Sequence, residues 1–77
     1  NVFKYELIDN KIYQIINDSK IKISDLYINH IIKIYEDNVY YLSNENLYTF
    51  NNKDGEVLLM SNFEWNFNNT NMIYIYK

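Results

Sequence analysis

The sequence predicts an α+β fold: an antiparallel β-meander of about six or seven short strands with one amphipathic helix packed on it. The meander is predicted because short alternating apolar runs are separated by Asn and Asp, which tolerate the left-handed backbone of tight turns. The helix is predicted because residues 25–37 gather their apolar side chains on one side of a helical wheel. Since 77 residues make one small domain, residues 1–77 are expected to share a single core.

The chain begins with a pattern typical of a β-hairpin followed by a third short strand. Val2 to Ile8 alternates between apolar and polar residues, Asp9-Asn10 supplies a turn, and Lys11 to Ile16 returns along the first strand. A short alternating segment from Lys20 to Ile23 then leads into the expected helix. Three antiparallel strands are therefore predicted before the helix.

The helix is predicted over residues 25–37, with Ser24 as its N-cap and Asn38 as a left-handed stop. The Ile31-Ile32 doublet interrupts the strict alternation that a half-buried strand needs. Against a helix stands intrinsic propensity, because Ile and Tyr are mediocre helix formers. The apolar face of this helix is expected to cover the inward side of the sheet with Tyr27, Ile28, Ile31, Ile34 and Tyr35.

Three further strands are predicted after the helix, over Val39 to Leu42, Leu47 to Phe50 and Glu56 to Met60. The turn before the last of them contains Asp54-Gly55, the strongest turn signal in the chain. Such spacing is typical of an antiparallel meander.

A last hairpin is predicted at the end of the chain. Phe63, Trp65 and Phe67 alternate with polar residues and are expected to share one side of the sheet. After a turn over residues 68–71, Met72 to Tyr76 forms the closing strand.

An internal repeat gives a competing interpretation. The segment "YELIDNKIYQIIND" aligns with "YYLSNENLYTFNNKDG" at a period of about 35 residues. Residues 36–61, "EDNVYYLSNENLYTFNNKDGEVLLMS", resemble the Tyr-rich blade repeats of bacterial propeller-like domains. The resemblance implies an all-β chain in which Ile31 to Tyr35 is a strand. Two repeats cannot close a propeller, which needs at least about four blades, so closure would require assembly or a longer parent chain.

The composition argues against catalysis and against bound cofactors. There is no Cys, so disulfides and thiolate metal sites are excluded. His30 is the only imidazole and lies on the polar side of the predicted helix, as a solvated histidine would. Gly55 is the only Gly, so a Gly-rich phosphate loop cannot form. We therefore expect a non-enzymatic protein without metal or cofactor.

Direct binding to nucleic acid and insertion into a membrane are not expected either. The net charge is −3, the Lys residues are dispersed, and there is no Arg to clamp phosphate or guanine. No apolar run approaches the roughly 18 residues that span a membrane. A cytoplasmic location is the expectation.

The excess of Tyr is the one positive indication of function. Nine Tyr and one Trp are more amphipathic aromatic side chains than so small a core hides, and such residues are enriched at protein–protein hot spots. An aromatic surface bordered by carboxylates is therefore expected to bind a protein partner. The candidate partner-binding residues are Tyr40, Tyr48, Trp65, Tyr74, Tyr76, Glu36, Asp37, Asp54 and Glu56.

These observations favour two functions. The first is a small inhibitor that blocks a partner's working surface. In size and composition the chain is similar to phage-encoded inhibitors of the anti-CRISPR type, and a partner that handles nucleic acid would present a basic groove to the carboxylates. The alternative is a structural blade-like β-repeat unit that self-assembles as a homo-oligomer or belongs to a larger receptor-type domain.

Overall fold

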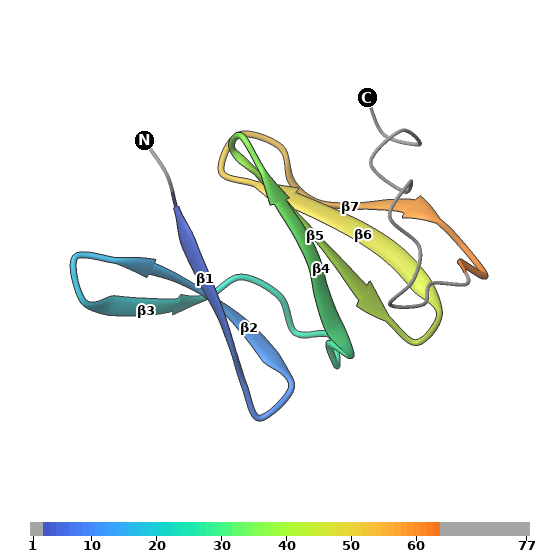
Figure 1. Ribbon diagram of the computed structural model, residues 1–77, viewed down its shortest axis with the longest axis horizontal. Coiled ribbons are helices and arrows are strands. Elements are labelled where there is room, and N and C mark those ends of the chain that lie inside the picture. The colour runs from blue at the N-terminus through green and yellow to red at the C-terminus, as the bar shows by residue number, and fades with distance from the viewer. Residues whose placement is uncertain (1–2, 64–77) are drawn as a thin grey trace.

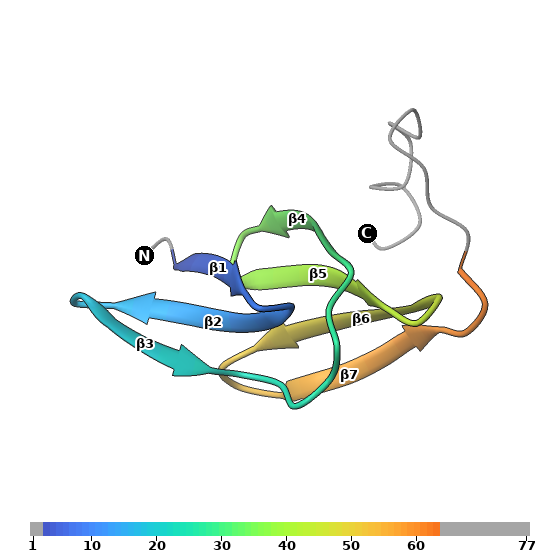
Figure 2. The same ribbon diagram turned by 90° about the horizontal axis from the view of Figure 1, so that it is seen from below.

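The computed structural model describes residues 3–63, and this part of the chain is all-β. Seven strands form two antiparallel sheets that pack against each other and are joined by residues 23–29 (Figures 1 and 2). Each sheet is a meander in which neighbouring strands are consecutive in sequence. The first sheet contains β1 (Lys4–Ile8), β2 (Lys11–Ile16) and β3 (Ser19–Lys22), and the second contains β4 (His30–Tyr35), β5 (Asn38–Ser43), β6 (Asn46–Asn51) and β7 (Gly55–Met60).

The predicted helix over residues 25–37 is wrong, and with it the α+β class. β4 occupies much of this range instead and pairs with β5. The apolar residues at the start of β4 do not alternate because both faces of the strand are covered there, whereas Ile34 and Tyr35 at its end are exposed. Ile31 packs against the core between the sheets, whereas Ile32 packs against the cluster on the other face. The pairing register also shifts between Ile31 and Lys33, and this bulge adds a residue that breaks the two-residue period.

The strand at residues 30–35 agrees with the extended segment that the all-β alternative placed there. Ile and Tyr favour strands, so local propensity and structure agree at this point. Ser24, the expected N-cap, does accept a hydrogen bond from the Leu26 amide at 3.1 Å, but the chain makes only a bend there. Ser24 therefore stabilises a local bend and does not begin a helix.

The turns predicted at Asp9-Asn10 and at Asp54-Gly55 are confirmed. Residues 9–10, 17–18 and 44–45 are two-residue hairpin turns, and all six have positive φ, between 48° and 68°. Two consecutive left-handed residues make the turn type that matches the twist of antiparallel strands. Gly55 has a φ of 76° and ends the longer turn between β6 and β7.

The structure repeats itself with a spacing of 35 residues. β1–β3 and β5–β7 are both three-stranded meanders, and their first turns, at 9–10 and 44–45, have the same left-handed backbone. After each meander, the chain makes the same backbone hydrogen bond back to the first turn of that meander. The Ile28 amide donates to the Asn10 carbonyl at 2.8 Å, and the Phe63 amide donates to the Glu45 carbonyl at 2.7 Å.

Two apolar clusters stabilise the two repeats. Between the sheets, Ile12 of β2 meets Val39 and Tyr41 of β5, and all three have no exposed surface. On the far side of the second sheet, Leu47 is fully buried against Phe63. Leu47 occupies the position in its repeat that Ile12 occupies in the first. Each such buried aliphatic side chain contributes about 1.5–3 kcal/mol to stability.

Candidate functional site

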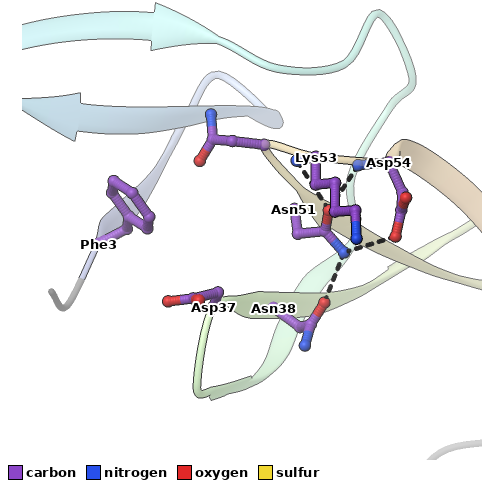
Figure 3. Close-up of a pocket in the computed structure, with 7 residues that line it drawn as sticks. Phe3, Asp37, Asn38, Asn51, Lys53 and Asp54 are labelled. Atoms are coloured by element: carbon purple, nitrogen blue, oxygen red, sulfur yellow. Dashed lines mark hydrogen bonds between the residues drawn. The ribbon is translucent and has the colours of Figure 1, made fainter.

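A hollow of about 350 Å³ lies at the end of the second sheet where β4 turns into β5 and β6 turns into β7 (Figure 3). Both turns contribute polar side chains, and the chain before β1 contributes one aromatic ring. The lining residues are Phe3, Asp37, Asn38, Asn51, Asn52, Lys53 and Asp54.

Asn51 organises this hollow through its side-chain amide. Its Nδ2 donates to Oδ1 of Asn38 at 2.8 Å and makes a longer contact of 3.4 Å with a carboxylate oxygen of Asp54. Its Oδ1 accepts hydrogen bonds from the backbone amides of Lys53 and Asp54, at 2.9 and 2.6 Å. Figure 3 shows these bonds converging on Asn51 from both turns. One side chain therefore sets the backbone of the β6–β7 turn and ties that turn to β5.

A second amide pair joins the hollow to the first sheet. Gln14 is only 1% exposed, and its Nε2 donates to Oδ1 of Asn52 at 2.8 Å, while Nδ2 of Asn52 donates back to Oε1 of Gln14 at 3.1 Å. The Gln14 amide also donates to the Tyr5 hydroxyl at 3.0 Å. Buried amides need such partners, so the Gln14–Asn52 pair locks the two sheets in one relative position.

The chemistry of the hollow is that of hydrogen bonding and charge. Asp37 and Asp54 offer carboxylates and Lys53 offers an ammonium group, all on exposed turns. His30 begins β4, at the opposite end of the strand from these turns. Within residues 3–63, no three His, Cys, Asp or Glu side chains converge as metal ligands would. The hollow is thus suited to contacting a polar or basic group of a partner.

The structure brings two of the predicted site residues together. Asp37 and Asp54 are distant in sequence yet line the same hollow. Glu36 precedes Asp37 in the same turn, is exposed, and has a left-handed φ of 54°. These three carboxylates form an acidic rim at one end of the second sheet.

Glu56 was also predicted as a partner-binding carboxylate, but it does not line the hollow. Its carboxylate accepts a hydrogen bond of 2.6 Å from the Tyr41 hydroxyl, whose residue is fully buried between the sheets. Burial raises the pKa of the Tyr41 phenol well above its usual range, and the Glu56 carboxylate beside it raises that pKa further. Glu56 therefore stabilises a core tyrosine.

Of the predicted aromatic site residues, the structure describes Tyr40 and Tyr48. Tyr48 is half-buried, and its ring stacks on that of Tyr41 with centroids 6.1 Å apart. Tyr40 is half-buried on the other face of β5 and takes part in further interactions. Trp65, Tyr74 and Tyr76, together with the predicted hairpin over residues 63–76 apart from Phe63, lie outside the described residues. The predicted aromatic surface is thus not assembled from Tyr40 and Tyr48.

An apolar surface that the sequence analysis missed lies on β7. Val57, Leu58, Leu59 and Met60 are 41%, 50%, 36% and 38% exposed. We name these four residues the β7 apolar segment. Four consecutive apolar residues are typical of a strand buried on both faces, so the sequence signal was present but indicated a core position.

Comparison with protein families, with curated proteins and with solved structures finds no match to this chain. Over residues 3–63 the chain forms no helix that could cross a membrane.

Proposed function

We propose that this chain is a non-catalytic structural module built from blade-like β-repeats, and that it acts by associating with protein. The supporting observation is the repeated hydrogen bond by which Ile28 returns to Asn10 and Phe63 returns to Glu45. Repeat units of this kind bury apolar faces against neighbouring units, so their surfaces are suited to association.

The arrangement of the core supports the same proposal. The first sheet covers one face of the second through Ile12, Val39 and Tyr41. The corresponding position of the second repeat, Leu47, is covered from the opposite face by Phe63. Each repeat thus presents an apolar face toward the next segment of the chain, which is how stacked repeats form a continuous core.

Sedimentation velocity over a wide range of protein concentration tests the proposal. A self-associating module gives species whose masses are multiples of 9.4 kDa. Activity that turns over many substrate molecules per chain would contradict the proposal, and so would a chain that stays monomeric and is retained by no protein.

A second candidate is an inhibitor that covers the basic working surface of a partner, such as a protein that handles nucleic acid. It is supported by the acidic rim, where Asp37 and Asp54 line one exposed hollow. Complementary charge of this kind speeds association and weakens with salt.

Immobilised polylysine is a simple probe for this rim. The double variant Asp37→Asn with Asp54→Asn should elute at lower salt than the control Asp9→Asn with Asp18→Asn, which removes the same charge from turns of the first sheet. Equal elution of the two double variants would show that net charge, and not the rim, governs retention.

A further inference from the structure

The face of the second sheet that is turned away from the first sheet is apolar, and we call it the far face. Leu42 of β5 opposes Leu47 of β6 there, and both pack with Ile32 and Phe63. Opposed residues of antiparallel strands share a face. Val57 of β7, opposite Thr49, lies on the same face and is 41% exposed. The far face therefore has apolar surface that a further segment can bury.

On the first sheet, the corresponding face is covered by β5. Ile12 lies 35 residues before Leu47 and is fully buried in the cluster between the sheets. That cluster also contains Val39 and Tyr41, alternate residues of β5 with no exposed surface. A pair of alternate residues on one strand therefore covers the first repeat.

The sequence contains a counterpart of this pair 35 residues later. Val39 and Tyr41 correspond to Tyr74 and Tyr76, within the apolar run at 72–76 that the sequence predicts as a strand. Ile28 and Phe63 also correspond, through the backbone hydrogen bond that each makes to its own meander. Equal lengths of chain thus lead from this hydrogen bond to the covering pair in both repeats.

We propose that residues 72–77 of this chain cover the far face as β5 covers the first sheet, with Tyr74 and Tyr76 packed over Leu42 and Leu47. This inference rests on the proposed function, because it takes the 35-residue repeat as the unit of the module, and it names the segment that covers the second repeat. A tyrosine suits this place. Tyr41 buries its ring at the corresponding position while its hydroxyl reaches a polar partner.

The same chain is favoured over a second copy as the source of this segment. Phe63 ends the described part of the chain, is only 6% exposed and packs on Leu47. The following residues therefore start at the face that they are proposed to cover. A short connection gives such a segment an effective concentration on the order of millimolar, so a second copy at micromolar concentration competes poorly.

A cysteine placed on the far face reports whether the segment covers it, because the chain has no cysteine of its own. Leu42→Cys should react slowly with a thiol reagent, and adding Tyr76→Ala should speed that reaction by at least about tenfold, which corresponds to about 1.4 kcal/mol of lost protection. Adding Ile75→Ala should leave the rate nearly unchanged, since alternation places residue 75 on the other side of a strand.

The reactivity needs a control for unfolding of the whole chain. Ile21→Cys lies on β3, at a position that is 49% exposed. It should react rapidly, and at the same rate with or without Tyr76→Ala. Far-UV circular dichroism should show that the strands of each variant remain formed.

A double-mutant cycle gives a second measurement that needs no thiol. Leu42→Ala and Tyr76→Ala remove two residues proposed to touch, so their combined effect on the unfolding equilibrium constant should depart from additivity by at least about twofold. Leu42→Ala and Ile75→Ala should be additive. Leu42 is half-buried, so Leu42→Ala should leave a folded protein in which both cycles can be measured by urea unfolding.

The outcomes separate this inference from the proposed function. Slow reaction of Leu42→Cys at every protein concentration, relieved by Tyr76→Ala, supports it. Equal rates with and without Tyr76→Ala, together with an additive cycle, would overturn it and leave the proposed module standing. Protection that appears only as the concentration rises would place a second copy on the far face, and this too would overturn it. A protected chain that stays monomeric and is retained by no protein would support the packing and contradict the proposed association.

Discussion

Removing the hydroxyl of Tyr41 should change how the stability of the protein depends on pH. The phenol is fully buried and donates to Glu56 at 2.6 Å. Near neutral pH, Tyr41→Phe loses a hydrogen bond to a charged group, worth about 1.5–3 kcal/mol when well shielded. Because Glu56 is exposed and regains water, we expect a loss of only about 1 kcal/mol.

The alkaline range gives the sharper expectation. Burial and the neighbouring carboxylate raise the pKa of Tyr41 in the folded protein above the unfolded value of 10.0. The stabilisation of the neutral phenol is therefore complete below pH 10 and is lost as pH rises above it, because only the unfolded chain then releases the proton. The free energy of unfolding should fall by about 1.4 kcal/mol per pH unit from this group.

Tyr41→Phe removes this proton release, so its stability should decline less steeply than that of the wild type. The two curves should meet about one pH unit above 10, where the wild type has lost roughly what the hydrogen bond supplied. Tyr5, whose pKa is also raised by burial, leaves a residual slope in both proteins.

Urea unfolding between pH 7 and pH 11, followed by circular dichroism, measures both curves. Tyr27→Phe is the control, because Tyr27 is 51% exposed and its loss should change neither the stability nor the slope. Parallel curves for wild type and Tyr41→Phe above pH 10 would refute the reasoning, since they would show that Tyr41 is not held neutral by the fold.

The other predictions concern stability and are measured by urea or thermal unfolding. Gln14→Leu should cost about 1 kcal/mol because it removes the hydrogen bonds to Asn52, which is exposed and regains water, and a double-mutant cycle with Asn52→Ala should show coupling; additive losses would contradict the pair. Ile12→Ala should cost about 2–5 kcal/mol, since Ile12 has no exposed surface; a loss below about 1 kcal/mol would contradict its place in the core. Glu45→Gly should stabilise by up to about 1 kcal/mol, because Glu45 has a φ of 68°, and no gain would indicate that the turn is relaxed.

The sequence predicted the turns well and the segment between the sheets badly. Asn and Asp have a local physical reason to take left-handed backbone, so the turn at 9–10 could be located without tertiary information. β4 could not, because its two faces pack on different clusters. A strand covered on both sides has no two-residue period, and its continuous apolar run also satisfies a helical wheel.

In the candidate site too, local features could be predicted from the sequence, whereas contacts between distant residues could not. Asp54 was predicted in a turn, whereas Asp37 was predicted at the end of the helix that proved wrong. Their meeting is explained once the two turns lie at one end of the sheet. The roles of Gln14 and Glu56 depend on partners 38 and 15 residues away, Asn52 and Tyr41. Such pairings arise only from the packing of the sheets, and no local pattern indicates them.

The face that the second sheet buries against the first is apolar, whereas the corresponding face of the first sheet is charged. This difference limits how copies of the chain can join. The second sheet turns Val39 and Tyr41 toward the first sheet, where both are fully buried. The residues 35 positions earlier are Lys4 and Glu6, which are exposed, and Glu6 pairs with Lys20 at 3.0 Å. The corresponding face of the first sheet is therefore charged and remains in water.

A charged outer face of this kind is typical of the capping unit of a repeat array. Another copy cannot stack there without removing Lys4 and Glu6 from water, at a cost that no apolar contact on that face offsets. Head-to-tail stacking into a closed ring of copies, which needs that face, is accordingly disfavoured. An assembly of copies in which this face of the first sheet stays in water requires neither charge to be buried.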